Sequence, residues 1–347
     1  MSDILIDLYS DTLSKPTLAM RQFMCQAEVG DEQKGEDPTV NLLQEMVSEL
    51  LDKEAALFLP SGTMCNQIAA LIHCRIGDEI LMDKTAHSLN YEGGGASALA
   101  GAIITPLNGD RGCFTRLQVL DAVRPLSRHQ PRTSLLVVEQ TSNMSGGKIW
   151  PLVSIREVCE AARTSKLRTH LDGARLLNAV VATGVSAKEY AFDFDTAWID
   201  LSKGLGAPVG AVLAGTKEFV QEAWQWKQRL GGSMRQAGII AAGGVYALRN
   251  HVNRLVDDHQ KAKRLAEGLT DISGVDVDPN NVETNIVIFE ISRLGFSTPE
   301  VAAKLLDNGL RVSVVNGQKQ LRAVTHLDIS WKDIEDTLQI VKKVIEN

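Results

Sequence analysis

The chain has 347 residues, of which 44% are hydrophobic and 23% are charged, and its formal net charge at pH 7 is −7. This length and composition are typical of a soluble enzyme with a substantial core and two domains. Charges of both signs are interspersed, so no basic face can follow a phosphate backbone, and we expect no nucleic-acid partner. No apolar stretch approaches the roughly 18 residues that span a bilayer, and no basic run leads into an apolar segment at the N-terminus. We therefore expect no membrane association and a cytoplasmic location.

The cysteines are odd in number and include no Cys-x-x-Cys pair, which predicts reduced structural thiols. No spacing of His, Cys and Glu suggests a catalytic metal. The five cysteines are Cys25, Cys65, Cys74, Cys113 and Cys159.

Short apolar runs rich in β-branched residues alternate with helical patterns along the first 250 residues. This alternation predicts βαβ units and a mostly parallel sheet, the α/β class. Helical patterns occupy 39–51, 64–76, 155–164 and 217–229. Strands are expected at 56–59, 79–82, 102–106, 135–139, 168–171, 197–201 and 209–214.

The pattern changes after about Asn250. A charged amphipathic stretch at 251–269 precedes strands near 285–290 and 322–325, which helices separate and follow. We interpret residues 1–250 as a large domain and residues 251–347 as a smaller C-terminal α+β domain, and we leave open that the N-terminal segment joins the small one.

Ser61, Gly62 and Thr63 stand where a predicted strand meets a predicted helix. Free backbone N–H groups at a helix N-terminus point toward an anion such as a phosphate. A serine before a helix is more often a simple N-cap, so the motif is weak evidence when taken alone.

Two further segments end predicted strands with chemically useful residues. Asp172 closes the run Arg168-Thr-His-Leu-Asp, and Ser202 and Lys203 follow the next strand. A lysine there can hold the aldehyde of pyridoxal phosphate (PLP) as a Schiff base, while an aspartate pairs with the pyridine nitrogen. Arg175 can meet a substrate carboxylate with its guanidinium. Individually, an Asp-Gly turn and a solvated lysine are common, so the combination of sites carries the interpretation.

Several strings in order make the chain resemble the low-specificity L-threonine aldolases almost from end to end. They are His-Leu-Asp-Gly-Ala-Arg at 170–175, Leu-Ser-Lys-Gly-Leu-Gly-Ala-Pro-Val-Gly at 201–210, Gly-Glu-Asp-Pro-Thr-Val-Asn at 35–41, Phe-Leu-Pro-Ser-Gly-Thr-Met at 58–64, Met-Arg-Gln-Ala-Gly at 234–238 and Arg-Ala-Val-Thr-His at 322–326. The resemblance implies the aspartate-aminotransferase fold (fold type I), PLP as cofactor, and cleavage of β-hydroxy-α-amino acids into glycine and an aldehyde. It also implies a homotetramer whose active sites lie between subunits.

The resemblance assigns roles to individual residues. Lys203 becomes the Schiff-base lysine and Asp172 the partner of the pyridine nitrogen. His87 becomes the group that stacks on the cofactor ring, and it or a water that it positions is the candidate base. Ser61, Gly62, Thr63, Arg175 and Ser202 join the cofactor-binding set; Ser10, Arg175 and Arg322 match the residues that hold the substrate carboxylate; Arg235 matches a basic residue that reaches a phosphate from the neighbouring subunit.

Three positions depart from the commonest pattern of these enzymes. Ser142 stands where many relatives have a histidine that contacts the β-hydroxyl, Lys34 where they often have a tyrosine, and Gln228 where they usually have a phosphate-binding lysine. The position of Ser142 still predicts a substrate contact, but the preference for threo or erythro substrates stays open. Phenylserine, 3-hydroxyaspartate, β-elimination and transamination remain alternatives on the same residues, because the reaction type depends on which bond is aligned.

Overall fold

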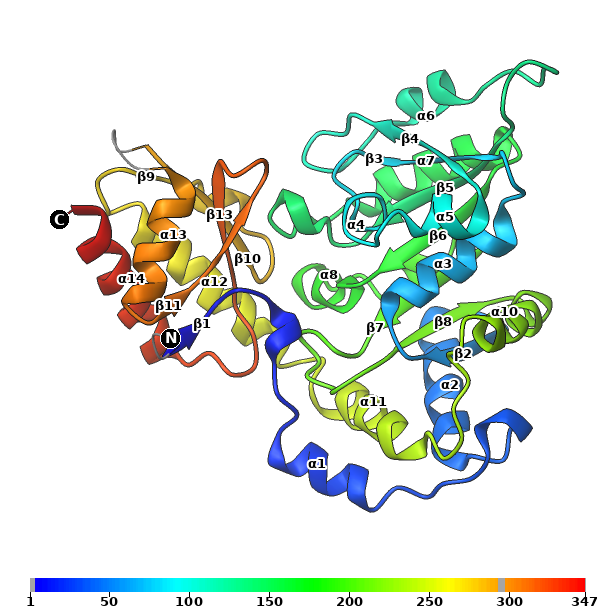
Figure 1. Ribbon diagram of the computed structural model, residues 1–347, viewed down its shortest axis with the longest axis horizontal. Helices are drawn as coiled ribbons and strands as arrows, with labels where there is room; N and C mark the ends of the chain where they lie inside the picture. The colour runs from blue at the N-terminus through cyan, green and yellow to red at the C-terminus, as the bar shows by residue number, and fades with distance from the viewer. Residues whose placement is uncertain (1–3, 293–296, 347) are drawn as a thin grey trace.

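The computed structural model describes residues 4–292 and 297–346. Its centre is a seven-stranded sheet in the order β2-β8-β7-β6-β5-β3-β4 (Figure 1). β8 is antiparallel to both of its neighbours, and the other paired strands run parallel. The strands are β2 (Ala55–Leu59), β3 (Glu79–Asp83), β4 (Ile103–Leu107), β5 (Thr133–Glu139), β6 (Arg168–Gly173), β7 (Thr196–Asp200) and β8 (Ala211–Gly215).

These seven strands confirm the α/β prediction and lie close to the predicted ranges. Pro106 occurs inside β4, which is an edge strand and can therefore lose one donor without breaking the ladder. The predicted helix at 64–76 and the amphipathic stretch at 251–269 differ from the observed helices at their ends: α3 (Gly62–His73) begins at the glycine after its cap, and α12 (Leu255–Leu269) begins only after a turn.

Helices cover both faces of the sheet, as the alternation of buried side chains in β2 requires. Phe58 belongs to a core formed with α2 (Pro38–Leu51), α7 (Leu152–Thr164), α8 (Leu176–Thr183) and α11 (Gly238–Asn250). Leu57 and Leu59 point to the opposite face and pack against α3 and α10 (Lys217–Arg229). The smaller helices are α1 (Leu18–Cys25), α4 (His87–Asn90), α5 (Gly95–Ala100), α6 (Arg116–Ala122) and α9 (Ala187–Ala191).

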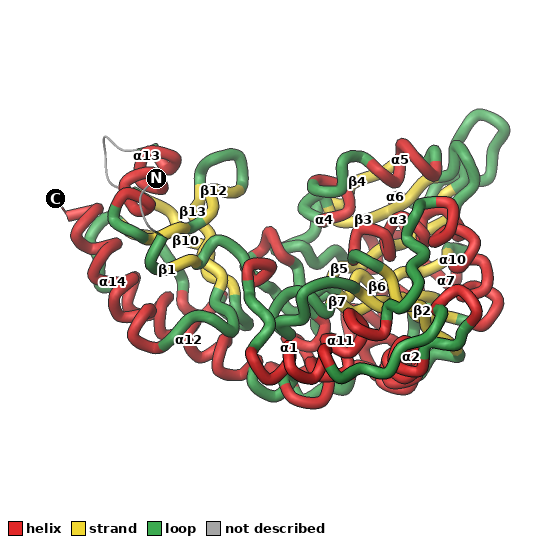
Figure 2. Tube along the Cα trace, turned by 60° about the horizontal axis from the view of Figure 1, so that its bottom comes forward, coloured by secondary structure: helices red, strands yellow, loops and turns green. Residues whose placement is uncertain are grey.

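A second, antiparallel sheet lies beside the first, with its own hydrophobic core (Figures 1 and 2). Its order is β12-β13-β10-β9; α12 and α13 pack against it, and α14 packs against these two helices. The elements are β9 (Val275–Asp276), β10 (Ile286–Ile291), α13 (Thr298–Asp307), β12 (Ser313–Val315), β13 (Gln320–Val324) and α14 (Trp331–Glu346).

The N-terminal segment crosses to this smaller part of the molecule. β1 (Ile6–Asp7) pairs in parallel with β11 (Leu310–Arg311), and Leu8 is buried in the same core as the second sheet. α12 connects the two parts, because Leu255 packs into the large core and Leu269 into the small one. A division at residue 250 stays a prediction.

Two further features concern the whole chain. All five cysteines are free, and Cys65, Cys74 and Cys159 are buried. Within the described ranges, no helix combines the length and the apolar character needed to cross a membrane.

Candidate active site

A pocket of about 590 Å³ lies where β5, β6 and β7 end, between the large sheet and the smaller part of the molecule. Open α/β sheets bind ligands at this edge. The wall brings together ten of the residues that the sequence singled out: Ser10, Ser61, Gly62, Thr63, His87, Asp172, Arg175, Ser202, Lys203 and Arg322.

Asp172 is the penultimate residue of β6 and is almost completely buried. Its Oδ2 accepts a hydrogen bond from Asn66 Nδ2 at 2.9 Å and its Oδ1 accepts one from Ala174 N at 3.1 Å, so both donors are neutral. Burial, followed by the negative charges of Glu139 and Glu92, raises the pKa of Asp172 to about 7. A protonated ring nitrogen in the pocket would supply the missing positive charge. This carboxylate therefore fits the pyridine of PLP.

The N-terminus of α3 forms another part of the wall. Ser61 is the N-cap, and its side chain accepts a hydrogen bond from Met64 N at 3.3 Å, so the simple capping role is present. Gly62 lies so close to Trp198 that a Cβ there would come within 2.3 Å of the indole ring. The glycine lets the helix begin directly over this ring, and the first N–H groups of α3 would be donors to an anion bound there.

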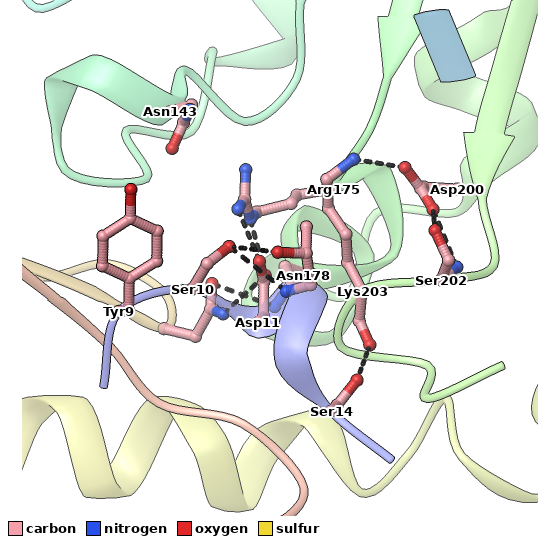
Figure 3. A network of polar contacts seen from close by, with 12 residues as sticks. Tyr9, Ser10, Asp11, Ser14, Asn143, Arg175, Asn178, Asp200, Ser202 and Lys203 are labelled. Carbon is pink, nitrogen blue, oxygen red and sulfur yellow. Dashed lines mark hydrogen bonds and ion pairs between the residues drawn. The ribbon is translucent and has the colours of Figure 1, made fainter. Parts of the chain in front are cut away.

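Lys203 reaches the pocket from the turn after β7. Its ammonium pairs with Asp200 and lies 5.7 Å from the centre of the Trp198 ring. Its carbonyl oxygen accepts a hydrogen bond from Ser14 Oγ at 2.8 Å, which anchors the turn to the N-terminal segment (Figure 3). Ser202 Oγ donates to Asp200 Oδ1 at 2.8 Å. The lysine that the sequence selected is thus held in place at the end of a strand.

Two arginines add positive charge to the pocket, beside the ammonium of Lys203. Arg175 donates from Nε and Nη2 to both oxygens of Asp11, at 2.8 and 2.7 Å, and its remaining nitrogen turns away from Asp11 (Figure 3). Burial alone would raise the pKa of Asp11, but the charge and hydrogen bonds of Arg175 hold it well below its usual value. Arg322 donates to Asn143 Oδ1 at 2.7 Å. Both guanidinium groups are therefore fixed in orientation before a ligand arrives.

His87 begins α4 at the opposite side of the pocket. Its backbone N–H donates to Glu139 Oε2 at 2.8 Å, and its Nδ1 lies 3.3 Å from Glu92 Oε1. Burial lowers the pKa of His87, but the hydrogen bond to Glu92 and the charges of Asp172 and Glu139 outweigh burial and raise it above its usual value. The imidazole is therefore oriented by one carboxylate and electrostatically coupled to two more.

Two predicted residues are not brought into this wall. Ser142 is buried: its backbone N–H bonds to Lys148 O at 2.9 Å, and its hydroxyl faces Gly112, where a Cβ would come within 2.1 Å of it. Arg235 is exposed, and its Nη1 pairs with Asp31 at 3.1 Å. A role of Arg235 in a neighbouring subunit's site stays a prediction.

The departures at 34 and 228 also lie outside the wall, since Lys34 and Gln228 are exposed. Lys227, the neighbour of Gln228, is fully buried, pairs with Glu32 and donates to Phe58 O at 2.8 Å. The charge of Lys227 is therefore paired with Glu32 inside the protein.

Sequence reasoning missed four polar residues that organise the site. Asp11 holds Arg175, Glu139 holds His87 and Asn143, and Asn66 Nδ2 bridges Glu92 and Asp172 at 2.8 and 2.9 Å. Asp200 alone left a signal, because it is a charge that closes an otherwise apolar strand three residues before Lys203. Among the described residues, no group of three or more His, Cys, Asp or Glu side chains could hold a metal ion.

Comparison with known proteins agrees with this site. Residues 7–292 match the family model described as beta-eliminating lyase. The low specificity L-threonine aldolase of Escherichia coli K12 is 40% identical over 96% of this chain and 97% of its own. The probable low-specificity L-threonine aldolase 2 of Arabidopsis thaliana is 39% identical over 99% of this chain and 98% of its own.

A solved structure supports the fold. The crystal structure of a putative L-allo-threonine aldolase from Listeria monocytogenes superposes with a TM-score of 0.81 at 22% identity and covers 99% of this chain and 97% of the other. The likeness confirms fold type I, with its large, mostly parallel sheet and smaller antiparallel one. With strands, pocket and sequence in agreement along nearly the whole length, the chain belongs to the low-specificity L-threonine aldolases, within the beta-eliminating lyase family.

Proposed function

We propose that the protein is a PLP-dependent carbon–carbon lyase that cleaves L-threonine, L-allo-threonine and related β-hydroxy-α-amino acids to glycine and an aldehyde. The observation that carries the proposal is the meeting of Lys203, Asp172 and His87 with two arginines in one pocket. The relatives named above as threonine aldolases, at 40% and 39% identity, support this choice of reaction.

Three sites of the large sheet would hold the cofactor. Ser61, Gly62 and Thr63 offer backbone N–H groups to its phosphate, Asp172 keeps its ring nitrogen protonated, and Lys203 holds its aldehyde carbon. When bound, PLP supplies an electron sink for the carbanion that Cα–Cβ cleavage leaves.

Arg322, Ser10 and the free nitrogen of Arg175 would bind the substrate carboxylate. Because Asp11 and Asn143 fix the two guanidinium groups, the carboxylate is held in one orientation. Holding the carboxylate decides which substituent of Cα stands perpendicular to the cofactor ring, and so which bond breaks. For the proposed aldol cleavage, the bond held perpendicular would be Cα–Cβ.

His87 is the proposed base that removes the proton of the β-hydroxyl. A general base must be neutral and within hydrogen-bond reach of the proton that it takes. The imidazole lines the pocket through a side chain that is about a third exposed, at 36%. Glu92 receives the hydrogen bond from Nδ1 and thereby leaves Nε2 free to accept the proton.

Aldehyde release from the PLP-loaded protein tests the proposal. Four substrates are compared: L-threonine, L-allo-threonine, phenylserine and 3-hydroxyaspartate. We expect release from at least L-threonine and L-allo-threonine, and none from the Lys203→Ala variant. Absence of release from all four substrates by the loaded wild type would refute the aldolase function.

A β-eliminating reaction is the second candidate, because the matching family model carries that description. β-Elimination of threonine releases ammonia and a 2-oxo acid, whereas retro-aldol cleavage releases glycine and acetaldehyde. Quantifying both pairs of products in one reaction separates the two. A transaminase would instead leave the cofactor in its amine form after a single turnover.

For the assembly we propose a homotetramer in the cytoplasm, with each active site completed by a neighbouring subunit. The exposed Arg235, outside its own pocket, supports the shared site, and the five free cysteines support a reducing compartment. Co-refolding Lys203→Ala with Arg235→Ala subunits tests the sharing, since mixed assemblies contain some sites with both residues intact. Activity that does not return on mixing would contradict a shared site, and cell fractionation checks the location.

A further inference from the structure

Asp200 is a buried carboxylate for which the proposed chemistry has no assigned use, because Asp172 already serves the ring nitrogen. It is the last residue of β7, and its side chain is only 4% exposed. Its Oδ2 contacts Nζ of Lys203, the atom that would bind the cofactor (Figure 3). A negative charge therefore lies directly against the reacting nitrogen.

The position of this carboxylate does not depend on Lys203. Asp200 Oδ1 accepts hydrogen bonds from Ser202 N at 2.7 Å and from Ser202 Oγ at 2.8 Å. Its backbone is paired with Ala211 of β8. The strand and the turn thus fix one oxygen and leave the other directed at Nζ, so the acceptor is preorganised.

The backbone of Lys203 is fixed as well. Its carbonyl oxygen accepts from Ser14 Oγ and from Gly206 N, both at 2.8 Å. With the main chain held, Nζ of Lys203 can bond either to a cofactor in the pocket or to Asp200.

Exchange of Lys203 for a substrate amine would leave a full positive charge on Nζ, whereas the charge of the protonated C=N bond is shared with the cofactor. As the C=N bond between the cofactor carbon and the substrate nitrogen forms, the C=N bond to Lys203 breaks. Two protons of the substrate ammonium move to Nζ, which changes from a singly protonated, bonded nitrogen to a free ammonium. A carboxylate in contact favours the charged form of a neighbouring amine.

We propose that Asp200 is a positioning residue that acts through Lys203: it captures the released ammonium and so favours exchange of the lysine for the substrate amine. The inference rests on the proposed cofactor. It predicts that Asp200 favours the released state of Lys203, in which Nζ carries three protons and contacts the carboxylate as in this structure.

The test compares the Asp200→Asn holoenzyme with wild type. Glycine, which lacks the Cα–Cβ bond that is cleaved, is titrated in while the visible absorbance of the bound cofactor is followed. We expect the glycine concentration at half-change to rise about tenfold or more in Asp200→Asn, because the released ammonium loses the opposite charge that it contacts. Asp52→Asn is the control, since Asp52 is half-exposed, pairs with Lys188 and has a left-handed backbone that asparagine tolerates.

A second readout uses the cofactor-free protein. The ion pair with Asp200 competes with bonding of Lys203 to the cofactor, so removing the carboxylate favours the bonded form. We expect the PLP concentration at half-maximal uptake to fall about tenfold in Asp200→Asn. Ser202→Ala, which frees Asp200 Oδ1 but keeps the charge, should shift it less.

The outcomes separate this inference from the proposed function. Wild-type protein that takes up no cofactor would overturn both. Normal uptake by wild type, with an unchanged glycine titration and uptake profile in Asp200→Asn, would overturn the role of Asp200 alone. A variant that only loses thermal stability, without either shift, would equally show that Asp200 is structural.

Discussion

Asp172 is a buried carboxylate whose direct partners are neutral, and its effect on stability can be measured. Burial, followed by Glu139 and Glu92, raises the pKa of Asp172 from 3.8 to about 7. The folded protein therefore binds this proton more tightly than the unfolded chain, and the stability that the group contributes at low pH is lost as the pH rises from near 4 through about 7.

We expect the cofactor-free wild type to lose about 2–3 kcal/mol of unfolding free energy from this group between about pH 5 and about pH 8. The Asp172→Asn variant lacks this titrating group, so its free energy of unfolding, measured with urea, should fall less over the same interval. Loading wild type with PLP should remove the difference, because the protonated ring nitrogen pairs with the carboxylate. Parallel profiles for wild type and variant would mean that Asp172 does not titrate in this range.

His87 predicts a pH dependence of the reaction itself. Because a base must be neutral, kcat/KM for threonine should fall as the pH drops through the raised pKa of His87. Glu92→Gln removes a charge that raises this pKa, so the acidic limb of the profile should move to lower pH. His87→Phe keeps an aromatic ring but no base and should lose about 10²–10⁴-fold in kcat. If kcat survived and only cofactor affinity fell, His87 would be a stacking group.

At the scale of elements, the start of α3 is set by the contact between Gly62 and Trp198 of β7. A Cβ at position 62 would come within 2.3 Å of the outer indole carbons. We expect Gly62→Ala to move the first turn of α3, weaken cofactor binding at least tenfold, and cost about 1–3 kcal/mol of stability, as overpacking does. Equilibrium dialysis with PLP and thermal unfolding measure the two effects.

Trp198→Phe supplies the matching test, because the smaller ring lacks the atoms that the Cβ would meet. This change also removes the hydrogen bond from Trp198 Nε1 to Asn66 Oδ1, at 2.8 Å, so it has a cost of its own. In a double-mutant cycle, Gly62→Ala should cost less in the Trp198→Phe background. If the losses of stability from the two substitutions were additive, the contact with the Trp198 ring would not be the reason that position 62 requires glycine.

The strands of the large sheet were predictable because each is a run of apolar residues that pairs with a similar run. β1, β9 and β11 were not, since two residues carry no periodicity and form strands only against distant partners. Lys203 and Asp172 stand out in sequence because they follow such strands. Asp11 and Asn66 do not, because their roles arise only from contacts 164 and 106 positions away along the chain, with Arg175 and Asp172.

Across the whole molecule, the two ends of the pocket come from different parts of the fold. The residues proposed for the cofactor lie at the start of α3, on β6 and in the turn after β7, all in the part of the molecule built on the large sheet. Arg322 lies on β13, and Ser10 follows the N-terminal strand that joins the smaller part. Substrate alignment therefore depends on how the two parts are held together, whereas cofactor binding does not.

Glu283 links the large and the smaller part of the molecule. This residue, which precedes β10, bonds Lys148 Nζ at 2.8 Å, Ile149 N at 3.1 Å and Arg111 Nη1 at 3.3 Å across the junction. The side chains of all three charged residues are about a quarter exposed, between 24% and 28%. We expect Glu283→Gln to cost below about 1 kcal/mol of stability, as partly exposed ion pairs do.

The same variant should raise KM for threonine by about 3–10-fold, because a small displacement of Arg322 misaligns the carboxylate. Its affinity for PLP should stay unchanged, since no cofactor residue moves with the smaller part. Glu160→Gln is the matched control, because its exposed ion pair with Arg116 lies wholly within the large part. Should cofactor affinity fall as KM rises in Glu283→Gln, the two halves of the site would be coupled, and the rise in KM could not be assigned to the position of Arg322 alone.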